Sequence, residues 1–249
     1  MSGHSKWHSI KHKKGAADAK RGKIFTKHAK LIAIVAKNGG DPEMNPSLRA
    51  AIDNAKADNV PAANIEKAVK KGAGLDKNAA SYEEIYYEGF GAAGTALYIH
   101  VITDNKNRAV SDVKAILTKK GGNMGAAGSV GWMFERKGVI EIPVGGKDMD
   151  EIELAVIDAG AEDMKHEGDV LEVFTDATAL ARVRDALKET GVEFSTAEIT
   201  YLPTQTVKIE TKEDAKKVLG LIDMLEENED VADVYCNFDM SEELLEKIG

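Results

Sequence analysis

Side chains that could bind a metal or a polyanion are concentrated in the first 30 residues, MSGHSKWHSIKHKKGAADAKRGKIFTKHAK. His4, His8 and His12 recur every four residues, so a helix would align them as metal ligands. Nine lysines and arginines accompany them, against a single acid, Asp18. A divalent cation would therefore lie among positive charges with no carboxylate to orient its ligands, which disfavours a metal site.

The lysines and Trp7 instead favour binding to nucleic acid. Lys and Arg neutralise phosphates and release counterions, and an indole can stack on an exposed base. An ordinary solvated surface mixes both signs of charge, so the imbalance argues against the alternative, a solvated helix face behind a flexible tail. The candidate nucleic-acid-binding residues are Lys6, Trp7, Lys11, Lys13, Lys14, Lys20, Arg21, Lys23, Lys27 and Lys30.

A second group of polar residues follows the apolar run TALYIHVIT, where a buried strand is expected to end and a helix to begin. Asp104 or Asn105 can cap that helix. Polar groups at the carboxyl end of a strand can also bind a ligand, so a ligand-binding cleft between domains is the alternative. The candidate cleft residues are Asp104, Asn105, Asn107 and Arg108.

Neither the glycine-rich segment 121–131 nor Cys236 indicates catalysis. The segment, GGNMGAAGSVG, lacks the Gly-Lys-Ser/Thr ending of a P-loop and precedes a strand, so a flexible connection is expected. Cys236 lies in a strand pattern with no histidine near it in sequence, which predicts a buried thiol. Because no Ser/His/Asp, paired-carboxylate or metal constellation is evident, we expect a protein that is not an enzyme and needs no cofactor or metal.

The charge of the chain is divided between its two ends. The 249 residues carry a formal net charge of -9, yet residues 1–77 carry +9 and the remainder carries -18. Such asymmetry suggests a polyanion-binding end. No apolar run approaches the roughly 20 residues that span a bilayer, and no apolar segment of a secretory signal follows the basic start. With one cysteine, the sequence predicts a cytoplasmic protein whose partner is nucleic acid and not a membrane.

Hydrophobic periodicity predicts a helical N-terminal region followed by mixed helix and strand. Three short helices are expected before Gly72, and in the first of them the lysines lie opposite the apolar residues on the helical wheel. Residues 137–202 follow the order β-α-β-β-α-β of a ferredoxin-like motif whose first strand is GVIEIPV, and SVGWMFE is expected to form a separate strand before it. Flanking ββαβ and βαβ segments suggest that this motif is inserted into another domain, although a serial arrangement is the simpler expectation.

Several segments then resemble the YebC/PmpR family over almost the whole chain. They are GHSKWHSIKHKKGAADAKRGKIFTKHAK, NGGDPEMNPSLRAAIDNAKADNVPAANIEKAVKKGAG, YEEIYYEGFGAAGTALYIHVITDNKNR, GGNMGAAGSVGWMFERKGVI and LIDMLEENEDVADVYCNFD. The resemblance implies an α+β protein with an N-terminal three-helix domain and two α/β domains of the ferredoxin-like α-β plait type, the third inserted in the second. The domains would be 1–80 (basic flexible arm and helices), 81–136 plus 203–249, and the inserted 137–202.

The resemblance also implies a non-enzymatic, cytoplasmic regulator of gene expression that binds DNA. The alternative is a ribosome-associated translation factor that binds ribosomal RNA or tRNA and relieves stalling at proline-rich stretches, since the family has relatives among mitochondrial translational activators. Two departures from the family pattern occur: Ala92 replaces a turn proline after Gly91, and His100 replaces a glutamate, which leaves any role of that carboxylate in doubt. No oligomeric state is predicted.

Overall fold

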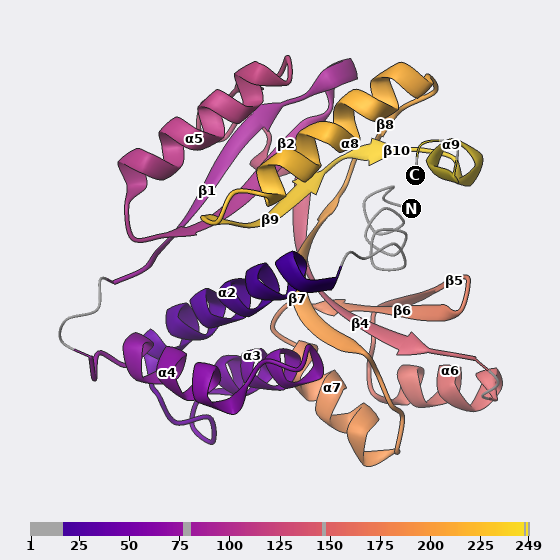
Figure 1. Cartoon of the computed structure of the whole chain (residues 1–249). Coiled ribbons are helices and arrows are strands. Elements are labelled where there is room, and N and C mark those ends of the chain that lie inside the picture. The colour runs from indigo at the N-terminus through magenta and orange to yellow at the C-terminus, as the bar shows by residue number, and fades with distance from the viewer. Residues whose placement is uncertain (1–16, 77–80, 146–147, 247, 249) are drawn as a thin grey trace. The chain divides into compact units, whose positions relative to one another are not determined.

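The chain folds into two compact units, each of which combines helices with a sheet (Figure 1). The computed structural model describes residues 17–76, 81–145, 148–246 and 248. The first unit contains the described residues up to Ile34, from 81 to Glu135 and from Leu202 onward, and the second contains Val35–Asp76 and Arg136–Tyr201. The predicted α+β class is confirmed, whereas the three-domain boundaries stay a prediction.

The sheet of the first unit has the strand order β3-β1-β2-β9, and each adjacent pair is antiparallel. Its register places Tyr86, His100 and Asp233 side by side on three neighbouring strands. The strands are β1 (Glu83–Phe90), β2 (Ala96–Thr103), β3 (Asn123–Met124) and β9 (Val231–Cys236). A separate parallel pair is formed by β8 (Val207–Lys208) and β10 (Phe238–Asp239).

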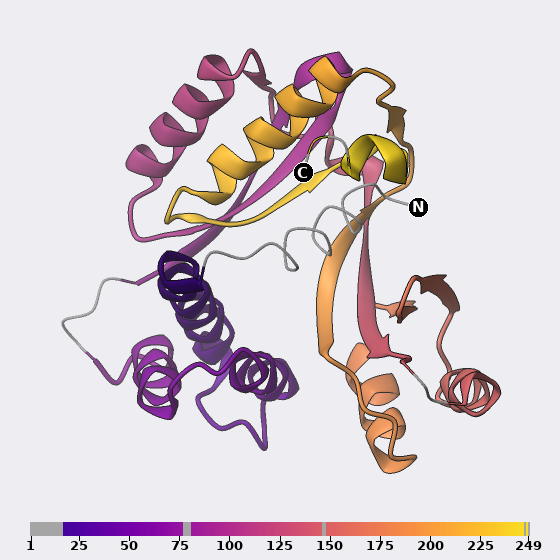
Figure 2. The same ribbon diagram turned by 45° about the vertical axis from the view of Figure 1, so that its right-hand side comes forward.

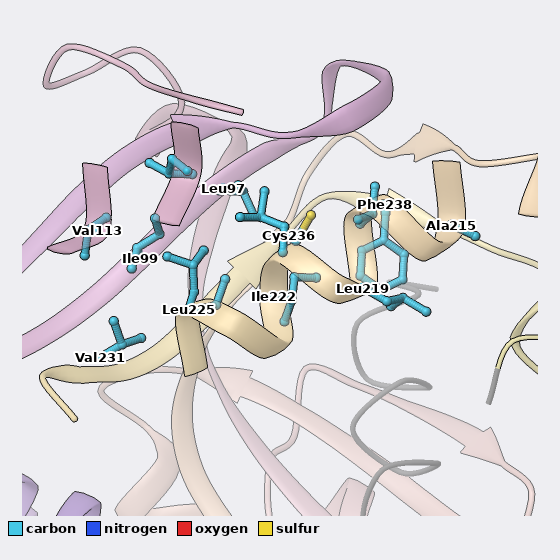
Figure 3. Close-up of a cluster of buried hydrophobic side chains, with 14 of the residues drawn as sticks. Leu97, Ile99, Val113, Ala215, Leu219, Ile222, Leu225, Val231, Cys236 and Phe238 are labelled. Atoms are coloured by element: carbon cyan, nitrogen blue, oxygen red, sulfur yellow. The ribbon is translucent and has the colours of Figure 1, made fainter. Parts of the chain in front are cut away.

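Two helices, α5 and α8, lie side by side on one face of this sheet (Figures 1 and 2). Alternation along β2 brings Leu97 and Ile99 into the core with Val113 of α5 and Ile222 of α8 (Figure 3). Burying each side chain of this size stabilises the fold by roughly 1.5–3 kcal/mol. Cys236 belongs to the same core, and burial raises its pKa to about 12, which confirms the predicted buried thiol. The helices of this unit are α2 (Ala17–Val35), α5 (Lys106–Lys119), α8 (Lys212–Glu226) and α9 (Glu242–Glu246).

The second unit contains a sheet of order β5-β6-β4-β7. The strand order and the chain order β-α-β-β-α-β together match the predicted ferredoxin-like motif. Its core is formed by one face of the sheet and two helices, with Ile140, Val156 and Val183 fully buried. Its elements are β4 (Phe134–Pro143), α6 (Met149–Asp158), β5 (Asp163–Glu167), β6 (Val170–Asp176), α7 (Leu180–Glu189) and β7 (Thr196–Pro203).

Helices α3 (Pro46–Ala57) and α4 (Ala62–Gly72) also belong to the second unit. Asn45 caps α3, because its side-chain oxygen accepts a hydrogen bond from the Leu48 N–H at 3.1 Å. Asn54 then joins α3 to the sheet by donating from Nδ2 to the backbone oxygen of Ala197 at 3.0 Å. Both helices lie in the segments where hydrophobic periodicity predicts helices.

One predicted pair of strands is a single strand in the structure. The segments SVGWMFE (129–135) and GVIEIPV (138–144) were expected to form separate strands, but Gly131–Met133 of the first form a short 3-10 helix, and β4 runs from Phe134 through Gly138 without a break. A Cβ atom at Gly138 would lie 2.3 Å from Thr175 Oγ1 and 2.8 Å from Leu180 Cβ, so glycine is required by close packing and does not end the strand.

Among the helices of the described ranges, none is both long enough and apolar enough to cross a bilayer.

Candidate nucleic-acid interface

The candidate nucleic-acid-binding residues fall into three groups in the structure. Those from Lys6 to Lys14 lie outside the described residues, as do His4, His8 and His12. Lys20 and Arg21 lie within the first turns of α2. The others, Lys23, Lys27 and Lys30, are spaced by four and three residues and therefore share one side of α2, which we call the lysine face.

The lysine face contacts a segment that follows α8. Lys23 Nζ donates to the backbone oxygen of Glu227 at 2.9 Å, and Lys27 Nζ forms an ion pair with Asp233 at 2.5 Å. Lys30 Nζ donates to Asp230 Oδ1 at 2.9 Å and to the backbone oxygen of Glu229 at 2.6 Å. We call these four acidic residues the acidic edge: Glu227, Glu229, Asp230 and Asp233.

These contacts correct the expected position of Lys30. The helical wheel placed it with the other lysines opposite the apolar residues, as a candidate contact to nucleic acid, but the side chain is buried, with 7% of the residue exposed. A helical wheel separates charged from apolar positions within α2 alone. It cannot show that acidic residues about 200 positions later in the sequence, such as Asp230, pack against the charged side. The acidic edge was missed for the same reason, although the run ENED at 227–230 and the opposite charges of the two segments were visible signals.

Asp230 is the centre of this contact. In addition to the bond from Lys30, Asp230 accepts two hydrogen bonds from the guanidinium of Arg108. Nε donates at 3.1 Å and a terminal nitrogen donates at 2.7 Å. Burial by itself would raise the pKa of Asp230, but the hydrogen bonds from Lys30 and Arg108 outweigh burial and lower it. A carboxylate shared by two cations therefore connects α2, the start of α5 and the segment before β9.

The residues expected to line a cleft have structural roles at the start of α5. Asn105 caps the helix, because its Oδ1 accepts from the Arg108 N–H at 3.1 Å, which confirms the cap that the sequence suggested. Asp104 pairs with the Arg108 guanidinium at 2.9 Å. The backbone oxygen of Asn107 accepts a hydrogen bond from Ser111. Ligand binding by these residues stays a prediction.

His100, on strand β2, lies beside Asp233 of the acidic edge. Its Nε2 lies 2.8 Å from a carboxylate oxygen of Glu84 and its Nδ1 lies 3.5 Å from Asp233 Oδ2, while the Tyr86 ring stacks on the imidazole at 4.7 Å between centroids. Burial would lower the pKa of His100, but the two carboxylates outweigh it and raise the pKa. Burial likewise opposes ionisation of Asp233, and Lys27 and His100 outweigh it, so the pKa of Asp233 is lowered.

We expect the stability of the first unit to fall with rising pH because of His100. Its pKa is higher in the folded chain than the ordinary value near 6.5, so its charge stabilises the fold below about pH 6.5 and this stabilisation is lost as the pH rises through the raised value. Asp233 keeps its charge in that range because its pKa is lowered. One proton allows a slope of at most about 1.4 kcal/mol per pH unit. Urea unfolding between about pH 6 and 8 measures it, and a His100→Gln variant with an unchanged slope would contradict the assignment.

The glycine-rich segment 121–131 contains β3 near its start, and its last residues form a loop built around one carboxylate. Glu88 of β1 accepts hydrogen bonds from the backbone N–H groups of Gly128 at 2.6 Å, Val130 at 2.5 Å and Gly131 at 2.8 Å. The loop is therefore not the flexible connection that its composition suggested. Converging N–H groups can bind a phosphate, but here Glu88 already occupies them.

Within the described ranges, no group of three or more His, Cys, Asp or Glu residues could hold a metal ion. The described site offers ionic contacts: the ammonium groups of Lys27 and Lys30 and the guanidinium of Arg108 face the carboxylates of Asp233 and Asp230.

Comparison with known proteins identifies the family. The profile of the "TACO1/YebC protein N-terminal domain" matches residues 5–75, and that of the "TACO1/YebC second and third domain" matches residues 82–238. The chain belongs to the TACO1/YebC family. The family resemblance seen in the sequence is confirmed, and the matches cover both the basic N-terminal segment and the two α/β regions.

Relatives of this TACO1/YebC protein are similar over their full length. Proteins from Geotalea uraniireducens and Geobacter sulfurreducens are 52% and 51% identical, with complete coverage of both chains, and one from Streptomyces coelicolor is 48% identical over all of this chain and 99% of its own. Each is named "Probable transcriptional regulatory protein". The names place the TACO1/YebC protein in a family of regulators.

A solved structure supports the fold. The crystal structure of a conserved hypothetical protein from Aquifex aeolicus is similar to this TACO1/YebC chain with a TM-score of 0.84 at 42% sequence identity, over 90% of this chain and 93% of that one.

Proposed function

We propose that this TACO1/YebC protein is a non-enzymatic, cytoplasmic regulator of gene expression that binds nucleic acid through its N-terminal basic segment. One observation carries the proposal: the first 30 residues contain nine Lys and Arg residues against one acid, in a chain whose net charge is -9. Such a concentration of cations neutralises phosphates and releases their counterions, which supplies most of the affinity for a nucleic acid without regard to its sequence.

Duplex DNA is the polyanion that we propose, because the relatives are named as transcriptional regulators. The remainder of the chain, with a net charge of -18 beyond residue 77, repels a DNA backbone. The basic segment and the first part of α2 would therefore make the phosphate contacts, while the acidic remainder limits how closely a duplex approaches. No residue in the sequence is assigned to reading bases.

Binding of the full-length protein to a mixed-sequence duplex of about 20 base pairs tests this proposal across a salt series from about 50 to 200 mM. We expect the affinity to fall by about 10³-fold or more over this range, because at least six phosphate contacts would be lost to competing cations. Salt-independent binding, or no binding at low salt, would contradict the function. A strong preference for a structured RNA over the duplex would contradict DNA as the target.

A further inference from the structure

The lysine face of α2 is occupied by two of the chain's own carboxylates and by a backbone oxygen. Lys27 contacts Asp233, Lys30 contacts Asp230, and Lys23 contacts the backbone of Glu227. We propose that the acidic edge is an intramolecular competitor of nucleic acid: it binds Lys23 and Lys27 in the free protein and releases them to phosphates in the complex. The proposal rests on the proposed function and adds a mechanism that limits affinity.

The contacts of the lysine face differ in how accessible they are. The side chains of Lys27 and Asp233 are 35% and 23% exposed, and the Lys23 contact to Glu227 is at the surface. A phosphate can therefore approach either ammonium group. Lys30 and Asp230 are only 9% and 8% exposed, and Arg108 also holds Asp230. The Lys30 pair is thus a fixed attachment of α2, and the other two contacts are the exchangeable ones.

The energetics favour exchange at Lys27. A partly exposed ion pair contributes only about 0–1 kcal/mol. A lysine that moves from a carboxylate to a DNA phosphate keeps a charge-assisted hydrogen bond and also gains the entropy of a released counterion. The carboxylate that it leaves is not stranded, because Asp233 keeps His100 at 3.5 Å and is partly open to water. The acidic edge therefore lowers affinity for nucleic acid without preventing binding.

Asp233→Asn in the full-length chain tests the competition, with Asp239→Asn as the matched control. Asp239 lies on β10 of the same unit and is also partly exposed, so the change in net charge is the same. With a mixed-sequence duplex of about 20 base pairs, we expect Asp233→Asn to tighten binding about 3- to 10-fold relative to the control and to steepen the dependence of log K on log salt by about one. In a Lys27→Gln background the same substitution should have no such effect.

A second measurement separates the competition from the proposed function. Amide hydrogen exchange of residues 22–34 without nucleic acid should be faster in Asp233→Asn than in the control, because a contact of α2 is lost. Equal DNA affinities of the two variants, or an Asp233→Asn effect that persists without Lys27, would overturn the competition and leave the function intact. Failure of the wild-type protein to bind DNA would overturn the function itself.

Discussion

Replacing Asp230 with alanine is expected to lower the free energy of unfolding of the first unit by about 3–5 kcal/mol. The buried carboxylate accepts hydrogen bonds from Lys30 at 2.9 Å and from Arg108 at 2.7 and 3.1 Å. Without it, the Lys30 ammonium group would remain in a buried site with no opposite charge to compensate its lost hydration. Removing one partner of a buried pair is costly even where the intact pair adds little net stability.

Urea unfolding measured by Trp132 fluorescence, in a Trp7→Phe background, reports this loss for the first unit. The matched control is Asp239→Ala, which removes the same side chain from a position that forms no ion pair within the described part of the chain. We expect it to cost less than about 1 kcal/mol. A double variant, Lys30→Met with Asp230→Leu, should recover much of the stability because neither charge remains. An Asp230→Ala loss as small as that of the control would show that the pair is not needed for the packing of α2.

Neutralising the cations of the basic segment is expected to remove most DNA binding. The variant changes six residues to glutamine in the full-length chain: Lys6, Lys11, Lys13, Lys14, Lys20 and Arg21. If each contacts one phosphate, the slope of log K against log salt falls by about five, and affinity near 0.1 M salt falls by at least about 100-fold. The same salt titration used for the wild-type protein measures both quantities.

A variant with the same change in net charge at other sites is the control for long-range electrostatics. It carries glutamine at six exposed lysines of the described helices: Lys56, Lys67, Lys114, Lys119, Lys212 and Lys216. Because these positions lie outside the proposed interface, we expect its affinity to fall by less than about tenfold and its salt slope to stay near that of the wild type. Equal losses in the two variants would show that overall charge, and not the N-terminal segment, controls binding.

Local signals in the sequence predicted much of the fold. Alternation and turn residues indicated the β-α-β-β-α-β order of the second unit, and the polar residue before α5 indicated the Asn105 cap. Both features depend on neighbours a few residues apart, where side-chain periodicity and backbone hydrogen bonding are decisive. The prediction of a separate strand at SVGWMFE was wrong, because Gly131–Met133 form a short 3-10 helix and a single strand begins at Phe134.

By itself the sequence determined the family, the fold class and the concentration of positive charge at the start of the chain, since each follows from residue order and composition. Only the tertiary structure decided what surrounds those charges. Lys27 and Lys30 meet Asp233 and Asp230 from about 200 residues away, and Glu88 meets the loop at 128–131 from about 40 residues away. Such pairs form where the packing of sheets and helices brings distant segments together. Neither composition nor periodicity shows which residues from distant segments will come into contact.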